Sequence, residues 1–282
     1  MSHYFRLLGP IEVTHKEERI HVGGPKQQMF LMALLFNMNR PVSLDWLTEA
    51  LWDGEPPPSA TANLRNYAGR LRSILSVLEG TRVMARYQAY QLVTTPEHVD
   101  LTRFERLVAD GRAQLSKGRC VDGVRRLDEA VSLWRYPLKY HMNCGKRLAA
   151  RVMIVQEQRL NVMEERAWAR LALGDHGRAI SELRLLLGEE PLREHAWALL
   201  MRALYAAGDA AGALRAYAEA RSCLLDRIGL DPGPELRRIH EAVLRRDLDV
   251  SVSPPPSLQR RERGEADHVW SGFHRDDALA TG

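Results

Sequence analysis

A spacing of 34 positions recurs in the second half of the chain and constrains the fold more than any other feature. Gly174 returns as Gly208, and Ala179 returns as Ala213, a shift of 34 positions in each case. Small residues at these places allow paired helices to cross closely. Because each repeat leaves one apolar face uncovered, neighbouring repeats must stack on one another into a right-handed, concave helical array.

The residues around the repeat fit the same arrangement. Pro191 ends the first helical hairpin, Tyr217 and Ala220 fill packing positions in the second, and Leu225 stands where a proline is usual. This period is that of tetratricopeptide repeats, whose concave surfaces usually bind proteins. The sequence therefore predicts an all-α, tetratricopeptide-like helical domain over residues 98–250. A weaker copy of the pattern precedes these repeats at Gly118, Gly123, Leu127 and Ala130.

Residues 1–97 have a different character, with short β-prone runs separated by breaks. A buried helix is expected over Lys26–Asn37, and two further helices within residues 41–78. The stretch Thr81–Thr94 predicts a β-hairpin. These elements indicate a compact α+β domain that ends near residue 97. Three short strands of a small antiparallel sheet are predicted at Tyr4–Leu8, Ile11–Val13 and Arg19–Val22.

The two helices within residues 41–78 are joined by a long turn. Ser43 can cap the first helix, and Ser59 or Thr61 can cap the second. Pro56–Pro58 cannot continue the first helix and make the turn longer than in a minimal helix-turn-helix. Long turns of this kind are typical of winged helices. Together with the hairpin, they predict a winged-helix domain over residues 1–97.

The second of these helices has two contrasting faces. At about 100° per residue, its apolar residues fall within roughly 40° of one line and predict a core stripe. The other side holds small residues, Asn and Arg, and no acidic residue occurs between Ser59 and Leu78. Such a face suits a DNA groove, although a surface helix with solvated arginines explains it about equally well. The stripe consists of Leu64, Ala68, Leu71, Leu75 and Leu78.

On the DNA-binding interpretation, Arg65, Asn66 and Arg70 read bases, because Arg can bond bidentately to guanine and Asn to adenine. Arg72, and Arg86 in the hairpin, mainly contact phosphates. Lys26 either reaches a phosphate or is solvated. The predicted DNA-binding residues are Lys26, Thr61, Asn63, Arg65, Asn66, Arg70, Arg72 and Arg86.

Composition narrows the setting. A net charge of +4 and an isoelectric point near 9.1 permit anionic partners without requiring them. Cys120, Cys144 and Cys223 lie far apart in the sequence, which argues against a zinc site or a disulfide framework and fits a reducing cytoplasm. The sequence contains no apolar run of membrane-spanning length. We therefore expect a cytoplasmic protein that holds no metal and no cofactor and does not enter a membrane.

Candidate enzymatic or ligand sites are weak. His141 and Cys144 lack the two further ligands of a metal site. Gly145-Lys146 lacks the upstream glycine and the following Ser or Thr of a phosphate-binding loop. No nucleophile elbow, zinc-protease motif or paired-carboxylate motif occurs in a convincing context. The sequence predicts that the protein is not an enzyme.

Several long segments resemble a known family. FRLLGPIEV, GGPKQQMFLMALLFNMNRPVS and LTEALWDGEPPPSATANLRNYAGRLRSIL occur in the first hundred residues. PLREHAWALLMRALYAAG and GLDPGPELRRIH follow in the helical part. Over roughly residues 4–250 the chain resembles the Streptomyces antibiotic regulatory proteins. It departs from their pattern at Ala89, where the hairpin usually has a glycine, and at Tyr136, where a small residue is usual.

The resemblance implies an OmpR-like winged-helix DNA-binding domain followed by a bacterial transcriptional activation domain. It also implies an activator of a secondary-metabolite gene cluster that binds direct repeats in double-stranded DNA and recruits RNA polymerase holoenzyme. Two protomers would then lie head to tail on the DNA. We expect the hairpin turn to be altered, because Ala89 resists the positive φ that glycine allows.

One alternative of a different class remains. A tetratricopeptide-like scaffold or ligand sensor would use residues 1–97 to dock protein, without binding DNA directly. The charged, aperiodic residues 251–282 predict a disordered tail that begins near Ser253–Pro256. Trp270 and Phe273 form a small contact motif there or, as we favour, belong to an unstructured end.

Overall fold

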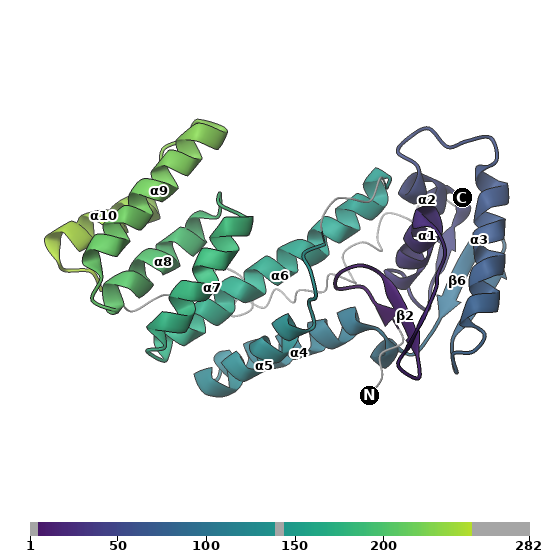
Figure 1. The fold of residues 1–282 in the computed structure, drawn as a ribbon, viewed down its shortest axis with the longest axis horizontal. Helices are drawn as coiled ribbons and strands as arrows, with labels where there is room; N and C mark the ends of the chain where they lie inside the picture. The colour runs from purple at the N-terminus through teal and green to yellow at the C-terminus, as the bar shows by residue number, and fades with distance from the viewer. Residues whose placement is uncertain (1–4, 139–143, 250–282) are drawn as a thin grey trace, which may run out of the picture. The chain divides into compact units, whose positions relative to one another are not determined.

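The computed structural model describes residues 5–138 and 144–249 (Figure 1). Their packing divides the chain into two compact units. Unit 1 comprises residues 5–110, 126–138 and 144–160, and unit 2 comprises residues 111–125 and 161–249. The predicted tail at residues 251–282 lies outside the described residues, as does His141 of the weak metal-ligand pair.

Unit 1 begins with a small antiparallel sheet, which confirms the prediction from the sequence. β1 (Phe5–Arg6) pairs with β2 (Glu12–His15), and β2 pairs with β3 (Glu18–Ile20). Phe5 and Val13 lie opposite one another in the first pair, and both are fully buried. Alternate side chains of these strands therefore face the core.

Helices fill the middle of unit 1. Pro25 stands in the first turn of the first helix, where its missing N–H removes no helical hydrogen bond. This helix is buried along most of its length, as predicted for the stretch that begins at Lys26. The three helices of this region are α1 (Pro25–Leu35), α2 (Leu44–Leu51) and α3 (Ala60–Leu75).

Only one of the two predicted helix caps forms as expected. The Ser43 hydroxyl accepts the backbone N–H of Trp46 at 3.2 Å and caps α2. Ser59 occupies the N-cap position of α3, but its hydroxyl accepts from the side-chain amide of Asn63 at 3.2 Å. No backbone N–H of α3 donates to this hydroxyl, so the predicted side-chain cap does not form.

A second antiparallel sheet contains the predicted hairpin. Its strands lie in the order β4, β6, β5, and Tyr87 and Gln88 form the turn of the hairpin. The expectation that Ala89 would disturb this turn is wrong. Ala89 is the first residue of β6, and the positive φ, 48°, falls on Gln88 instead. The strands are β4 (Pro41–Ser43), β5 (Arg82–Arg86) and β6 (Ala89–Val93).

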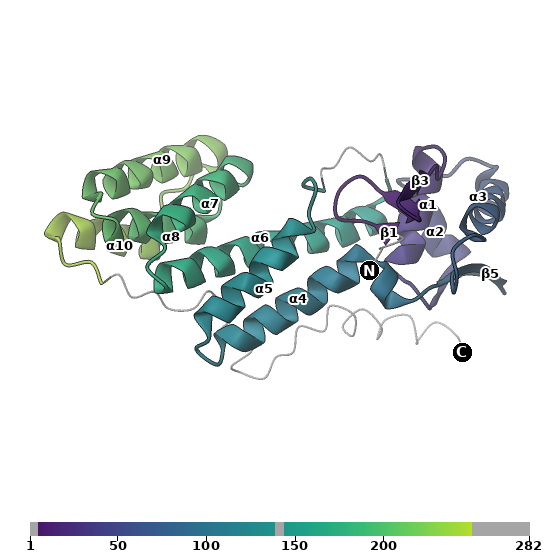
Figure 2. The ribbon, with the colours of Figure 1, turned by 60° about the horizontal axis from the view of Figure 1, so that its bottom comes forward.

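Long helices follow, and each contributes residues to both units. A short 3-10 helix, η1 (Pro96–His98), precedes α4 (Asp100–Leu115), which lies beside α5 (Cys120–Ser132) in a helical hairpin (Figure 2). α6 (Lys146–Ala172) comes next. Within unit 1, the rings of Phe104 and Trp134 meet edge to face with centroids 5.5 Å apart. Unit 1 is therefore built from residues well beyond position 97.

Unit 2 consists mainly of helices packed in sequence order. α8 packs against α7 and α9, and α10 packs against both α8 and α9. This arrangement buries one face of each helix against its neighbours and makes the second part of the chain a helical domain. The helices are α7 (His176–Glu189), α8 (Glu194–Ala206), α9 (Ala210–Ile228) and α10 (Pro234–Arg245).

The predicted recurrence corresponds to a repeated turn between helices. Gly174 and Gly208 have φ angles of 76° and 85°, a left-handed conformation that favours glycine. In each turn the glycine N–H donates to the carbonyl three residues earlier, at 3.0 and 2.9 Å. Ala179 and Ala213, five residues after each glycine, are fully buried. The two copies are therefore structurally equivalent at these positions.

The weaker copy has the same turn. Gly118 has a φ of 72°, and its N–H donates to the carbonyl three residues earlier at 2.9 Å. A side chain at Gly123 would overlap that of Leu115, which explains a glycine where the later copies have alanine. Leu127 and Ala130 are fully buried. This copy therefore retains the turn and the buried positions of the other two.

Candidate DNA-binding surface

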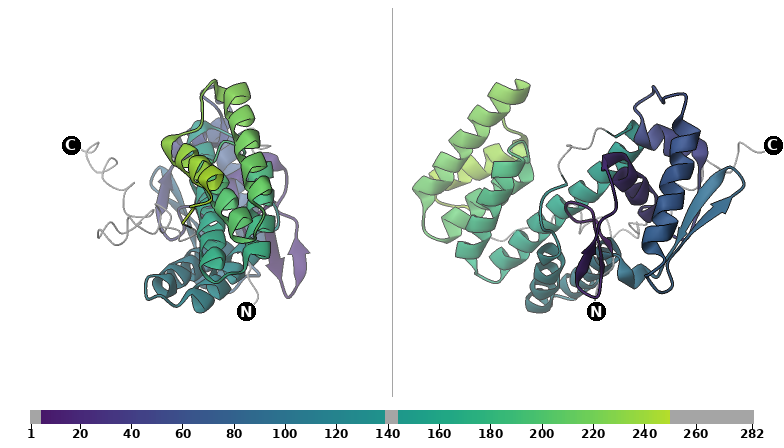
Figure 3. Two further views of the ribbon diagram at one scale, coloured as in Figure 1. Left: turned by 90° about the vertical axis from the view of Figure 1, so that its left-hand side faces the viewer. Right: turned by 45° about the vertical axis from the view of Figure 1, so that its right-hand side comes forward.

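The predicted stripe is confirmed. Its five residues, four in α3 and Leu78 just after it, are at most 2% exposed. α3 itself packs against α1, α2 and β5 (Figures 1 and 3). Burial of a leucine side chain stabilises a fold by about 1.5–3 kcal/mol. The stripe therefore fixes the rotation of the helix about its axis. That rotation decides which side chains α3 presents to solvent, because the opposite face cannot turn inward. The stripe residues are Leu64, Ala68, Leu71, Leu75 and Leu78.

The exposed side of α3 carries the predicted base-reading residues together. Arg65, Asn66 and Arg70 are all exposed, and Gly69 between them leaves the surface low. Within the described residues, neither Arg65 nor Arg70 forms an ion pair. Because the helix also contains no acidic residue, this face keeps its positive charge, which attracts phosphate-bearing partners. Thr61 is also exposed, at the start of the same helix.

The two arginines predicted to contact phosphates are both connected to the hairpin. Arg72 donates from Nε to the carbonyl of Val83 on β5 at 3.1 Å. Arg86, on the other end of β5, donates from Nε to Oε1 of Gln91 on β6 at 3.2 Å. Both side chains are exposed. The first bond links α3 to the hairpin, so the helix and the hairpin present their charges on one connected surface.

Lys26 and Asn63 have local roles in the fold. The Lys26 ammonium donates to the carbonyl of Leu51 at the end of α2, and it lies 5.8 Å from the ring centroid of Trp52. It is half-buried there, which removes it from the exposed face that α3 offers. Asn63 is half-buried, and its side-chain amide donates a hydrogen bond to the Ser59 hydroxyl. The structure thus groups Thr61, Arg65, Asn66, Arg70, Arg72 and Arg86 on exposed positions, and leaves Lys26 and Asn63 in structural contacts.

Sequence reasoning missed a residue at the hairpin tip. Tyr87 is 96% exposed, an unusual state for a large aromatic side chain. The sequence could have indicated this residue, because Tyr87 follows Arg86 directly in the predicted hairpin. An aromatic ring beside a guanidinium at a hairpin tip can enter a nucleic-acid groove or stack on a base. We therefore count Tyr87 with the exposed surface.

The helix before α3 is anchored by a segment distant in sequence. The Gly145 N–H donates to the carbonyl of Ala50 in α2 at 2.9 Å. A Cβ at Gly145 would overlap the carbonyl of Glu49, so only glycine fits this approach. The side chains of Glu49 and Arg147 also form an ion pair. The start of α6 thus holds α2, against which α3 packs.

A buried carboxylate joins the first sheet to α4. Asp100 accepts the backbone N–H groups of Leu7 at 2.7 Å and Leu8 at 3.1 Å. Burial raises the pKa of Asp100 to about 6, while these N–H groups and the charge of Arg135 act in the lowering direction. The desolvation of the charged form therefore outweighs its hydrogen bonds. Asp100 is a structural group that ties the residues directly after β1 to α4.

In the part of the chain that the structure describes, no group of three or more His, Cys, Asp or Glu side chains is placed to hold a metal ion. None of the helices in the same residues has both the length and the apolar character needed to cross a membrane.

Comparisons with known proteins agree with this architecture. The family described as "Bacterial transcriptional activator domain" matches residues 99–244, more than half of the chain. Regulatory protein AfsR of Streptomyces griseus is 34% identical over 253 residues, which are 88% of this chain and 25% of that protein. Transcriptional regulator RedD of Streptomyces coelicolor is 31% identical over 93% of this chain and 75% of its own length.

A solved structure extends the comparison to three dimensions. Mycobacterium tuberculosis EmbR, in complex with a low affinity phosphopeptide, is similar with a TM-score of 0.79 and 31% identity. The similarity covers 92% of this chain and 69% of that chain. The chain spans only a quarter of AfsR (25%) and 65% of the curated EmbR sequence. The chain belongs to the family of Streptomyces antibiotic regulatory proteins, which are transcriptional regulators with a bacterial transcriptional activator domain.

Proposed function

We propose that this protein is a sequence-specific DNA-binding activator of transcription that controls a secondary-metabolite gene cluster. The observation that carries the proposal is the exposed side of α3, where Arg65, Asn66 and Arg70 project without acidic neighbours while the leucine stripe is buried. AfsR and RedD are named as regulators, which supports the same class of function. Such a protein acts in the cytoplasm, on the nucleoid.

In this proposal residues 1–97 work as an OmpR-like winged helix. α3 enters the major groove, and its exposed Arg and Asn side chains bond to base edges. The hairpin of β5 and β6 is the wing, and Arg86 at its end meets phosphates or the minor groove. Arg72 contacts phosphates between these two elements. Lys26 and Asn63, which have partners within the fold, would act mainly by supporting α2 and the start of α3.

Two further partners are proposed, a second protomer on the DNA and RNA polymerase holoenzyme. An asymmetric reading head favours two protomers placed head to tail on a direct repeat, with repeats about 10–11 base pairs apart so that both lie on one face of the duplex. Residues 98–250 form a tetratricopeptide-like array, and its outward residues would contact RNA polymerase holoenzyme.

A gel-shift experiment on the promoters that neighbour the gene tests the proposal. We expect a shifted band on a promoter that contains a direct repeat, and loss of cooperative binding when half a helical turn, about 5 base pairs, is inserted between the repeats. Equal affinity at both spacings would contradict the head-to-tail arrangement. Absence of any specific band, with protein capture by the helical array, would favour a tetratricopeptide-like scaffold or ligand sensor.

A further inference from the structure

Gly69 stands in the interior of α3, where glycine is unfavourable. It is the tenth of the sixteen residues of this helix, far from both ends. Glycine weakens a helix because it loses more backbone freedom on folding than any other residue. Gly69 does not have a positive φ, so the backbone conformation itself does not require glycine. The reason for a glycine at this position must therefore lie in its surroundings.

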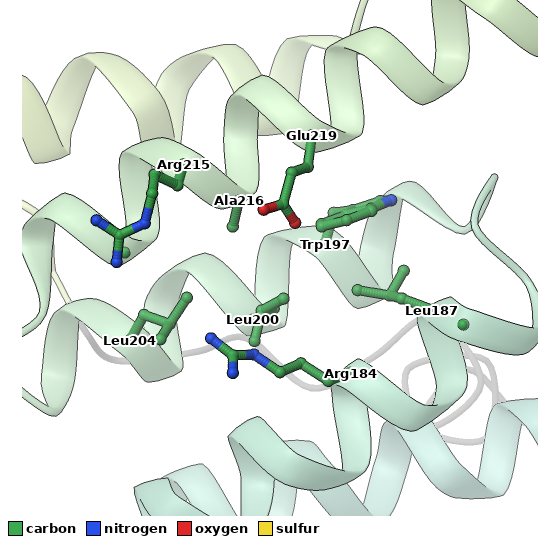
Figure 4. A pocket seen from close by; sticks show the side chains of 10 residues that line it. Arg184, Leu187, Trp197, Leu200, Leu204, Arg215, Ala216 and Glu219 are labelled. Carbon is green, nitrogen blue, oxygen red and sulfur yellow. The ribbon is translucent and has the colours of Figure 1, made fainter.

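Packing within the fold does not supply that reason. Gly69 is exposed, and a Cβ there would meet no atom within 4 Å among the described residues. Gly212 in α9 differs, because a Cβ there would overlap the Asp209 carboxylate. Gly188 also has open space, but it lies in the last turn of α7 and lines a groove between α7, α8 and α9 (Figure 4). The space above Gly69 is therefore not filled by any described part of the fold.

This space lies in the middle of the residues that are proposed to read DNA. At about 100° per residue, Arg65 and Arg72 project roughly 40–60° to one side of Gly69. Asn66 and Arg70 project roughly 60–100° to its other side. The buried stripe points away from it, roughly 100–180° around the helix. Gly69 is therefore the lowest point between two rows of long, exposed side chains.

We propose that Gly69 is the point at which the backbone of α3 comes closest to the floor of the major groove, and that the absence of a side chain there determines operator specificity. The inference rests on the proposed function, because it concerns the same helix in the same groove. A helix with its side chains is about 10–12 Å across, and the major groove is about 12 Å wide, so little room remains. A side chain at position 69 would hold Arg65, Asn66 and Arg70 away from the base edges together.

The two kinds of DNA contact should respond differently to such a side chain. Base readout requires hydrogen-bond distances to the base edges, whereas contacts with phosphates carry non-specific binding. Arg72 and Arg86 have long, flexible side chains, which can still reach phosphates when the helix is raised slightly from the groove floor. A larger residue at position 69 should therefore lower the affinity for the operator and leave the affinity for unrelated DNA unchanged.

Gly69→Ala and Gly69→Leu in the full-length protein test the proposal. Fluorescence anisotropy should be recorded on the promoter duplex that the wild type shifts and on an unrelated duplex. Alanine and leucine favour a helix over glycine, so the melting temperature should rise, by about 2–4 °C for Gly69→Ala. Affinity for the promoter duplex should nevertheless fall in the order of side-chain size, by about 10- to 100-fold for Gly69→Leu, which corresponds to the loss of one bidentate base contact. Damage to the fold cannot produce higher stability together with lower affinity.

Gly177→Leu is the matched control. Gly177 is also an exposed helical glycine with open space around its Cβ position, but it belongs to α7. This substitution should leave the affinity for both duplexes unchanged.

Three results would overturn the inference and leave the proposed function intact. The first is a Gly69→Leu protein that binds the promoter duplex with wild-type affinity. The second is an equal loss of affinity on the promoter duplex and on the unrelated duplex, because base readout would then not be involved. The third is a lower melting temperature in both Gly69 variants, which would assign the loss to the fold. A wild-type protein that does not prefer the promoter duplex would contradict the proposed function, and the inference with it.

Discussion

Arg112 and Glu165 form a bidentate ion pair inside unit 2. Arg112 Nε donates to Glu165 Oε2 and Arg112 Nη2 donates to Oε1, both at 2.9 Å. The side chains are 9% and 0% exposed, so both charges are shielded from solvent. The pair joins the end of α4 to α6. Such a pair adds little net stability over apolar residues of similar size, but the loss of one partner leaves an uncompensated buried charge.

Glu165→Gln should therefore destabilise unit 2 by about 3–5 kcal/mol. Urea unfolding followed by far-ultraviolet circular dichroism measures the change. The paired substitution Arg112→Met with Glu165→Leu should recover most of the lost stability, because no unpaired charge remains. The control is Asp122→Asn, which breaks an exposed pair with Arg125 (52% and 56% exposed) and should cost about 0–1 kcal/mol. Equal effects of Glu165→Gln and Asp122→Asn would contradict this account.

Asp100 should make the stability of unit 1 depend on pH. Its pKa is raised from 3.8 to about 6 in the folded protein, so its contribution is fully present below pH 3.8 and is lost as the pH rises through 6. A shift of about two units corresponds to roughly 3 kcal/mol at most.

The measurement is the free energy of unfolding of the wild type and of Asp100→Asn between pH 4 and 7. Asparagine does not titrate, so the wild type should lose stability relative to the variant as the pH rises from about 4 to about 6. Asp110→Asn, an exposed change in the same helix, should follow the wild-type profile. Parallel curves for the wild type and Asp100→Asn would show that Asp100 does not titrate in this range.

Gly145→Ala should loosen the contact between α2 and the start of α6. The new Cβ overlaps the Glu49 carbonyl, so the segment must move and lose its bond to Ala50. Overpacking of this kind costs typically about 1–3 kcal/mol. Gly177→Ala, in an exposed helical position with open space, should instead stabilise by about 0.5–1 kcal/mol. Thermal unfolding compares the two, and a gain of stability from Gly145→Ala would refute the proposed overlap.

The local features of this protein were predictable from its sequence because they recur with a fixed spacing. The buried stripe from Leu64 to Leu78 follows from the helical period, and the equivalent turns at Gly174 and Gly208 follow from the 34-residue repeat. The exposed face of α3 follows from the stripe, because it lies opposite.

Contacts between distant segments could not be predicted in this way. Nothing near Gly145 in the sequence indicates that it touches α2, and Asp100 meets the N–H groups of residues more than 90 positions away. These contacts also show why a fragment of residues 1–97 is a poor test of DNA binding, since it would leave Leu7 and Leu8 without their acceptor. The roles of Ser59 and Lys26 could not be predicted either. Ser59 bonds to the Asn63 side chain and Lys26 to the carbonyl of Leu51, and the sequence does not show that these partners are chosen over others.

The central claim is that the exposed face of α3 reads DNA bases, and Arg70 tests it most directly. Fluorescence anisotropy should be recorded with the full-length protein on its operator and on single-base variants, over a range of salt concentrations. Arg70→Ala should cost about 1–3 kcal/mol and relax the preference at one base pair, whereas Arg72→Ala should weaken binding to all sequences and reduce the salt slope by about one unit.

Arg227→Ala, which removes an exposed charge from α9, is the matched control and should leave both the affinity and the base preference unchanged. The account predicts loss of both affinity and base preference for Arg70→Ala, loss of affinity with unchanged base preference for Arg72→Ala, and neither loss for Arg227→Ala. An Arg70→Ala protein that binds the operator with unchanged affinity, base preference and salt slope would contradict it.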